Sequence, residues 1–344
     1  MIDLRSDTVT LPSDEMKNFM FNASIGDDVY REDPSVNLLE ERASKIFNKE
    51  SALFVPSGTM ANLIAVLSHC DRGDEIILGN QSHIFKYEAG GISVAGGIHS
   101  HQLINNDDGT INIKDIVSAI NHTDDSHFAI SKLVCLENTH NRCYGSAINP
   151  QYFTDVKQAV KPYNINIHID GARIFNASIA LDIDISKLVE NADSISCCLS
   201  KGLGCPSGSL VIGSKSFIKK ARRLRKMLGG GMRQVGILAA AGIFAFDHMI
   251  HRLKDDHYNA KQLGSEIALI PCINLDINKI STNLIFFHLK NNRISDESFI
   301  QQLKKHNIKI DSKGNGLFRI ATHIGFGNKD IEKVIKTFKL ILMK

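Results

Sequence analysis

Short apolar runs alternate with stretches of helical periodicity from about residue 50 onward. Residues 52–55 form an apolar run, residues 57–59 interrupt it, and over residues 60–69 the apolar positions recur at helical spacing. Five further apolar runs predict strands over residues 75–78, 133–136, 165–169, 194–199 and 209–212. Because strands separated by helices are typical of a parallel sheet covered on both faces, the sequence predicts an α/β fold with a mainly parallel sheet.

The pattern changes in the last third of the chain. Residues 215–227 and 234–246 predict two helices, which the glycines at 229–231 separate. Beyond them the sequence predicts three strands and a closing helix of a small α+β unit, over residues 283–289, 308–310, 317–321 and 330–343. We therefore expect an N-terminal arm and large domain over residues 1–248 and a small C-terminal domain over residues 249–344.

Composition narrows the classes of function. The chain of 344 residues has a formal net charge of +3, too small a bias to indicate nucleic acid or an anionic membrane as the main partner. The first ten residues carry charges and lack the apolar core of a signal peptide, and no run of about 18 apolar residues is present to span a membrane. The seven cysteines include no CxxC pair, which predicts buried free thiols in a reducing compartment. We expect a cytoplasmic globular protein and assign no metal ligands.

Three small residues at a predicted strand-to-helix junction, Ser57, Gly58 and Thr59, form a candidate phosphate site. Free backbone N–H groups and the positive end of the helix dipole favour an anion at such a junction. Gly58 would let the backbone approach the anion closely, and the two hydroxyl groups would add donors. The simpler interpretation is an ordinary turn in which a serine caps the helix.

Asp170 ends a strand rich in isoleucine, within the segment HIDGAR. The carboxyl ends of strands are where α/β sheets place their ligands, and a buried carboxylate is costly unless a cation meets it. The protonated nitrogen of a pyridine ring would supply that cation. The alternative is an ion pair between Asp170 and Arg173, three residues further along the chain.

Lys201 follows another predicted buried strand, in the segment CCLSKGLGCPSGS. A lysine that forms an imine must be partly desolvated, so that the pKa of its amine falls and a neutral amine is available. The small neighbours Ser200 and Gly202 leave room for a flat ring, although a lysine in a glycine-rich loop is usually a surface residue. The order of phosphate turn, aspartate and lysine resembles that of the aspartate-aminotransferase-like class of pyridoxal-phosphate enzymes.

Longer motifs sharpen this resemblance, and the chain is similar to the low-specificity L-threonine aldolases. The similarity rests on the segments MIDLRSDTVT, GDDVYREDPSVNLLEE, FVPSGTMANL, HIDGARIFNA, CLSKGLGCPSGSL and KMLGGGMRQVGILAAAG. It is dense over the first 250 residues and looser beyond them, where FRIATH carries it. Arg31 and the loop NTHNRCYGSAINP depart from the family pattern. The resemblance implies a seven-stranded sheet of the PLP-dependent transferase type and pyridoxal 5'-phosphate as cofactor.

The resemblance also implies roles for individual residues. Lys201 would hold the cofactor as a Schiff base, Asp170 would pair with its pyridine nitrogen, and His83 would stack on its ring. His127 would lie near the β-hydroxyl group of the substrate. The implied cofactor-binding set is completed by Ser57, Gly58, Thr59, Arg173, Ser200, Lys226 and Arg233.

Ser6, Arg173 and Arg319 are candidates to bind the carboxylate of an amino-acid substrate, and Tyr30 belongs to the implied substrate-binding set. An arginine suits this task because its planar guanidinium matches a carboxylate with two hydrogen bonds. Arg319 is the main candidate because it comes from the small domain and could close over the site. Arg173 contacts either this carboxylate or the phenolic oxygen of the cofactor, and the sequence leaves both roles open.

Seven of the twelve residues from Lys215 to Lys226 are lysine or arginine, which usually marks a solvated helix face. In the family, however, Lys226 and Arg233 approach the active site of the neighbouring subunit. The resemblance therefore implies a homo-oligomer, at least a dimer and commonly a dimer of dimers.

The reaction implied is the retro-aldol cleavage of L-threonine and L-allo-threonine to glycine and acetaldehyde. The base that removes the β-hydroxyl proton would be His83, His127 or a bound water. Two other enzymes on the same fold are alternatives, a β-eliminating lyase and an aminotransferase. A catalytically inactive scaffold is the non-enzyme alternative, and the presence of Lys201, Asp170 and Arg319 argues against it.

Overall fold

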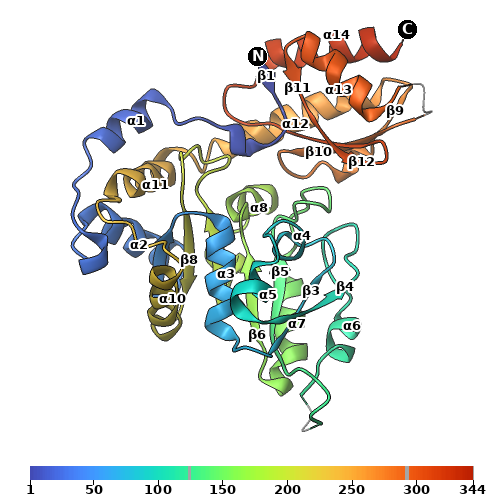
Figure 1. Ribbon diagram of the computed structural model, residues 1–344. Helices are drawn as coiled ribbons and strands as arrows, with labels where there is room; N and C mark the ends of the chain where they lie inside the picture. The colour runs from blue at the N-terminus through green and yellow to red at the C-terminus, as the bar shows by residue number, and fades with distance from the viewer. Residues whose placement is uncertain (123–124, 291–293, 344) are drawn as a thin grey trace.

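Seven strands form the main sheet, and a smaller unit packs beside one end of it (Figure 1). The computed structural model describes residues 1–122, 125–290 and 294–343. Only β8 runs antiparallel to its neighbours in the main sheet, so the prediction of an α/β fold with a mainly parallel sheet is confirmed. The strands follow one another across the sheet in the order β2 (Ser51–Val55), β8 (Ser209–Gly213), β7 (Ser194–Cys198), β6 (Asn166–Asp170), β5 (Ser131–Glu137), β3 (Glu75–Gly79) and β4 (His99–Leu103).

Six of these strands lie where apolar runs predict them, and β4 is the strand that the sequence analysis misses. Its sequence, HSHQL, contains no apolar run, and none of its five residues is buried. β4 lies at the edge of the sheet and pairs with β3 alone. An edge strand buries less of its side-chain surface than a central one, so hydrophobic periodicity does not mark it.

Helices cover both faces of the sheet. One face carries α3 (Gly58–His69), α5 (Gly91–Gly96) and α10 (Lys215–Met227). The other face is covered by α2 (Pro34–Ile46), α7 (Pro150–Val160), α8 (Ile174–Leu181) and α11 (Gly236–His248). The shorter helices of this part of the chain are α1 (Asp14–Phe21), α4 (His83–Lys86), α6 (Ile113–Ser118) and α9 (Ile185–Leu188).

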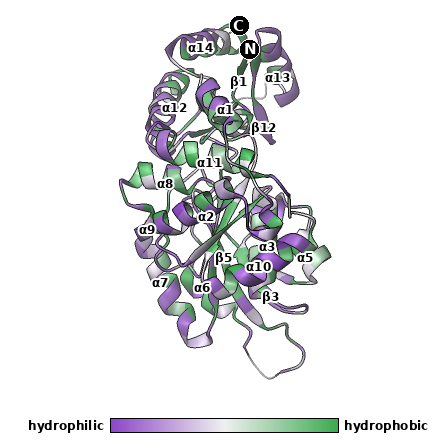
Figure 2. Ribbon diagram, turned by 90° about the vertical axis from the view of Figure 1, so that its left-hand side faces the viewer, coloured by the Kyte–Doolittle hydropathy of each residue, from purple (hydrophilic) through white to green (hydrophobic). Residues whose placement is uncertain are grey.

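Successive side chains of a strand point to opposite faces of the sheet, so one sheet contributes to two hydrophobic cores. Leu53 and Val55 of β2 pack against α3 and α10, whereas Phe54 between them packs into the larger core on the opposite face. Figure 2 shows the result, with hydrophobic strands in the interior and hydrophilic residues on the outer helices. The seven cysteines are free and six of them are buried, as the sequence predicts.

The smaller unit is built on a four-stranded antiparallel sheet. Its strands lie in the order β12 (Asp311–Gly314), β13 (Leu317–Ala321), β10 (Leu284–Leu289) and β9 (Ile273–Asn274). Its helices are α12 (Leu253–Ala268), α13 (Asp296–Lys305) and α14 (Asn328–Leu342). No helix in the described residues is long and apolar enough to cross a membrane.

The first strand of the chain joins the smaller unit. β1 (Ile2–Asp3) pairs in parallel with β11 (Ile308–Lys309), and Ile2 and Leu4 lie in the core of that unit. A domain boundary near His248, which remains a prediction, assigns this strand to the large domain although it pairs with the small one. The N-terminal segment therefore begins in the core of the smaller unit and then continues into the large domain.

Candidate active site

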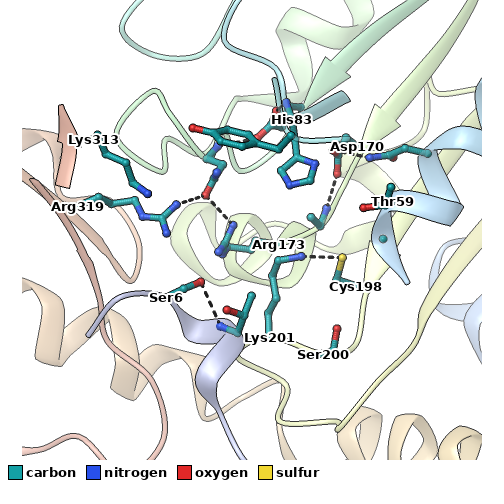
Figure 3. A pocket seen from close by; sticks show the side chains of 17 residues that line it. Ser6, Thr59, His83, Asp170, Arg173, Cys198, Ser200, Lys201, Lys313 and Arg319 are labelled. Carbon is teal, nitrogen blue, oxygen red and sulfur yellow. Dashed lines mark hydrogen bonds between the residues drawn. The ribbon is translucent and has the colours of Figure 1, made fainter. Parts of the chain in front are cut away.

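A pocket of about 330 Å³ lies at the carboxyl ends of the parallel strands (Figure 3). Asp170 is the last residue of β6 and Glu137 the last residue of β5, and the two are paired in register. Lys201 follows β7, and the small unit contributes Arg319 from β13 and Lys313 from β12. Parallel strands bring their carboxyl ends to one edge of the sheet, so residues far apart in the sequence meet here.

Lys201 points into this pocket from the loop between β7 and β8 (Figure 3). Its side chain is half-buried, and its Nζ lies 2.8 Å from the Sγ atom of Cys198. No salt bridge joins it to a carboxylate in the described part of the chain. Lys201 is therefore not the ordinary surface lysine that a glycine-rich loop suggests, and its amine is available to a ligand.

Asp170 is buried, with 2% of its surface exposed, and it receives hydrogen bonds from neutral donors. The Nδ2 atom of Asn62 donates to its Oδ2 at 2.9 Å, and the backbone N–H of Ala172 donates to its Oδ1 at 3.1 Å. The alternative in which Asp170 pairs with Arg173 is wrong, because Arg173 pairs with Asp7 instead. A buried carboxylate without a lysine or arginine partner favours a cationic ligand atom.

Asp7 holds Arg173 with two hydrogen bonds, from Nε to Oδ2 at 2.7 Å and from Nη2 to Oδ1 at 2.6 Å. Burial alone would raise the pKa of Asp7, but the charge and hydrogen bonds of Arg173 hold it well below its usual range. Only Nη1 of Arg173 remains for other partners, and it lies 3.2 Å from the Oδ1 atom of Asn141. Asp7 therefore fixes the orientation of Arg173.

Arg319 brings a second guanidinium to the same place. Its Nη1 donates to the Oδ1 atom of Asn141 at 2.7 Å, so Arg173 and Arg319 converge on one neutral oxygen. Burial and the nearby charge of Arg173 lower the pKa of Arg319, and its Nε has no partner. No salt bridge to Arg319 exists among the residues that the structure describes. This excess of positive charge favours binding of a carboxylate.

His83, at the start of α4, lies across the pocket from Lys201 (Figure 3). Its backbone N–H donates to Glu137 Oε2, and its Nδ1 lies 2.8 Å from Glu88 Oε1. Burial alone would lower the pKa of His83, but the hydrogen bond with Glu88 and the negative charges of Asp170, Glu88 and Glu137 raise it above its ordinary value. Its Nε2 has no partner in the described residues, so this nitrogen is free to meet a ligand.

The predicted phosphate turn opens on the pocket at the N-terminus of α3. The Oγ atom of Ser57 accepts a hydrogen bond from the backbone N–H of Met60, so Ser57 caps the helix as the simpler interpretation holds. Gly58 and Thr59 line the pocket, together with Ser200. A Cβ atom at Gly58 would lie 2.6 Å from Cys198 Sγ, so a larger residue here would displace the cysteine side chain. The free N–H groups at this helix end could hold an anion.

Five predicted site residues do not line the pocket: Ser57, whose Oγ caps α3, and four residues that lie outside it. Tyr30, Lys226 and Arg233 are exposed, and Arg233 pairs with Asp27 while its guanidinium lies 5.9 Å from the ring centre of Tyr30. The side chain of His127 is 86% exposed and lies before β5, at the amino end of the strand. Within one chain, the structure does not bring these four residues to Lys201. It brings together Ser6, Gly58, Thr59, His83, Asp170, Arg173, Ser200, Lys201 and Arg319.

Sequence reasoning missed several residues that shape the pocket. Asn62 lies one helical turn after Thr59 on α3, within a motif that the sequence analysis did quote, and Glu137 ends a buried strand as Asp170 does. The motif around Asn62 and the strand end at Glu137 could therefore have indicated both residues as site residues. Asp7 lies in the motif MIDLRSDTVT, but its partner Arg173 is distant in the sequence, so nothing local indicates their ion pair. Glu88 lies close to its partner His83 along the chain, but it belongs to none of the motifs that carry the resemblance.

Comparisons with known proteins agree with this arrangement. Residues 3–291 match the family model described as beta-eliminating lyase. The chain is 43% identical to low-specificity L-threonine aldolase 1 of Arabidopsis thaliana, across 99% of this chain and 96% of the plant protein. It is 41% identical to low specificity L-threonine aldolase of Escherichia coli O157:H7, across the full length of both.

Among solved structures, this chain is similar to threonine aldolase of Leishmania major. Its TM-score is 0.84 at 20% identity, and the match covers 99% of this chain and 100% of the other, which supports the fold. The family model and the two full-length relatives decide the classification. The chain belongs to the low-specificity L-threonine aldolases within the beta-eliminating lyase family.

Proposed function

We propose that this protein cleaves L-threonine and L-allo-threonine to glycine and acetaldehyde, with pyridoxal 5'-phosphate as its cofactor. The observation that carries the proposal is that one pocket contains an amine and a carboxylate, each without a protein partner of opposite charge among the described residues. The Lys201 amine has no carboxylate partner, and the buried Asp170 carboxylate has no lysine or arginine partner, among the residues described. One ligand that carries both an aldehyde and a basic ring nitrogen would satisfy both groups.

The residues present fit this cofactor. Lys201 would bind its aldehyde carbon, Asp170 would hold the proton on its ring nitrogen, and His83 would cover one face of its ring. The N–H groups at the start of α3, with Thr59 and Ser200, would hold its phosphate. When bound, the cofactor supplies an electron sink for the charge that develops as the Cα–Cβ bond breaks.

The substrate side of the pocket is the positively charged side. Arg319 and Nη1 of Arg173 would bind the carboxylate beside Asn141, to which both guanidiniums already donate. This contact would orient the amino acid so that its β-carbon faces His83. With Nδ1 engaged by Glu88, Nε2 of His83 would accept the proton of the β-hydroxyl group, directly or through a water.

Neighbouring copies of the chain would complete the site, so the proposal includes a homo-oligomer, a dimer of dimers. Lys226, Arg233 and Tyr30 are exposed together, and His127 is exposed at the far end of the sheet. Large apolar side chains near these residues in the sequence are also exposed, namely Phe21, Ile25, Leu38, Met227 and Ile237. Such a surface is typical of a subunit interface. The free thiols favour a cytoplasmic location.

One assay tests the proposed function. Purified protein loaded with pyridoxal phosphate is incubated with L-threonine and, separately, with L-allo-threonine, while acetaldehyde and glycine are measured. Equal amounts of the two products are expected from each substrate. Pyruvate and ammonia would identify a β-eliminating lyase, and a lasting pyridoxamine form that needs a keto acid would identify an aminotransferase; either result would overturn the proposal.

A further inference from the structure

We propose that Glu88 is a positioning residue, which holds the His83 imidazole by Nδ1 so that Nε2 is the nitrogen presented to the pocket. The inference deepens the proposed function and rests on it for the role of His83 in the reaction. Glu88 does not line the pocket, and it acts only through the histidine. Its contacts on the other side, with Asn62, connect it to Asp170.

Glu88 is buried behind His83, between α4 and α5, with 4% of its surface exposed. Its Oε1 atom lies 2.8 Å from Nδ1 of His83 and 2.7 Å from Nδ2 of Asn62. Its Oε2 is buried without a partner. An imidazole is ordinarily a stronger base than a carboxylate, so the proton shared by Nδ1 and Oε1 belongs on the histidine Nδ1, which donates to the carboxylate.

Asn62 makes the direction of these hydrogen bonds definite. Its Nδ2 donates to both Glu88 and Asp170, and its Oδ1 accepts from Ser196 Oγ at 2.7 Å and lies 3.2 Å from His168 Nε2. Turning the amide over would set its oxygen against two carboxylates, so this orientation is fixed. One amide therefore separates two acidic groups and satisfies an oxygen of each.

A carboxylate behind a histidine has a known physical effect. It fixes the tautomer and the ring orientation, and it stabilises the imidazolium that forms when the other nitrogen accepts a proton. The remaining charged groups that face His83 are Asp170 at the end of β6 and Glu137 at the end of β5, and the Tyr87 ring packs beside it. Among the residues that the structure describes, Glu88 alone contacts an imidazole nitrogen of His83, so its removal should change the pKa of the histidine most.

The first test needs no cofactor and no substrate. Apoprotein is titrated by NMR, and the His83 signal is identified by its loss in His83→Gln. In Glu88→Gln the midpoint of that signal should fall by about one pH unit, because a charged neighbour is replaced by a neutral one. A midpoint equal to that of the wild type would overturn the inference.

Glu75→Gln is the matched control. Glu75 is also buried and its Oε2 lies 2.8 Å from Nδ1 of His99, but it stands at the start of β3, away from the pocket. This variant should leave the His83 titration and the aldolase activity unchanged. A shift of the His83 midpoint as large in Glu75→Gln as in Glu88→Gln would show a general loss of structure and would overturn the inference.

A second measurement uses the wild-type protein alone and serves if Glu88→Gln does not fold. Nitrogen-15 shifts of labelled histidine report which ring nitrogen carries the proton in neutral His83. A proton on Nδ1 is expected, and a proton on Nε2 would overturn the inference. These readouts stand even if the protein cleaves neither substrate, so failure of the proposed function and failure of the Glu88 role are distinguishable.

For the active holoenzyme, Glu88→Gln should lower kcat more than tenfold while KM changes less than threefold, on the scale of about 10²–10⁴ expected for general base catalysis. The acidic limb of its kcat/KM profile should move to lower pH, because a histidine base with a lower pKa stays unprotonated in more acidic solution. An unchanged kcat and acidic limb would overturn the inference.

Discussion

Arg173 and Asp7 form a two-armed ion pair in the interior, with both hydrogen bonds shorter than 2.8 Å. Asp7 has no exposed surface and Arg173 is 6% exposed, so each charge has lost water and gained the other. Asn283 adds a hydrogen bond to Asp7 at 3.1 Å. The pair joins the N-terminal segment to the start of α8 and holds the Arg173 guanidinium at the edge of the pocket.

Asp7→Asn should destabilise the protein by about 3–5 kcal/mol, because it leaves Arg173 buried without its counter-charge. Urea unfolding at pH 7 measures this loss. Asp3→Asn is a suitable control, since it removes an exposed pair with Arg5 and should cost less than about 1 kcal/mol. Equal losses in the two variants would contradict the assignment.

The same carboxylate should contribute to acid sensitivity. The pKa of Asp7 in the folded protein is lower than its ordinary value of 3.8, so its contribution to stability is complete above that value and is lost as the pH falls below it. The unfolding free energy of the wild type should therefore fall more steeply below about pH 4 than that of Asp7→Asn. Parallel curves for the two proteins would speak against this role.

Lys201→Ala should abolish the borohydride-reducible link between protein and cofactor and nearly all turnover. The other lysine among the described residues that line the pocket, Lys313, forms a salt bridge with Asp311 of the same strand, β12. Lys201→Arg keeps the positive charge without a reactive amine and should fail in the same way. A reducible link that survives in Lys201→Ala would remove Lys201 from this role.

Asp170→Asn should retain the fold and lose most activity. A neutral amide does not hold a proton on a pyridine nitrogen, so the electron sink weakens. We expect kcat/KM to fall by more than tenfold, which corresponds to about 1.4 kcal/mol of barrier. Circular dichroism checks the fold, and a smaller fall in a folded variant would show that Asp170 has another task.

Arg233→Ala should weaken cofactor affinity although Arg233 lies outside the pocket of its own chain. Mixing this variant with Lys201→Ala protein should restore some activity when subunits exchange. Each mixed pair would then hold one site with both defects and one site with neither. Absence of rescue, with exchange demonstrated by differently tagged subunits, would mean that Arg233 serves no neighbouring site.

Both L-diastereomers of threonine should be cleaved, with kcat/KM values within about two powers of ten, because placing a methyl group is worth only about 1–3 kcal/mol. If His127 of a neighbouring copy faces one β-substituent and His83 the other, His127→Ala should slow one diastereomer more than the other. A histidine that only fills space would affect both alike. Strict use of one diastereomer by the wild type would exclude two bases.

Most of the fold could be predicted from the hydrophobic pattern of the sequence, because buried central strands and amphipathic helices leave a periodic signal. Helix α10 begins and ends where the pattern predicts, at Lys215 and Met227. The exposed edge strand β4 left no such signal. The short strand β1 was also missed, because two residues are too few to show a period and its partner β11 lies at the other end of the chain.

Some residues of the candidate site could likewise be predicted from the sequence, and others could not. Asp170 and Lys201 follow apolar strands in long motifs, so their place at one sheet edge could be inferred from the sequence. The role of Asp7 could not, because its partner Arg173 is brought near only by folding. The role of Glu88 could not either, because Glu88 lies outside the motifs that carry the resemblance, although His83 is close to it along the chain. The far position of His127 was also unforeseen, since a motif assigns a residue to a site without saying which copy of the chain supplies it.

The pairing of β1 with β11 also bears on how the protein is made. During synthesis Ile2 leaves the ribosome long before its partner Ile308, because most of the sequence lies between them. Closing so long a loop is slow and entropically costly, so this contact forms late. Ser6 and Asp7 directly follow β1, and they reach the pocket only with it. The nascent chain can thus assemble its main sheet early, yet Arg173 gains its counter-charge, and the pocket its final shape, only after Ile308 has emerged.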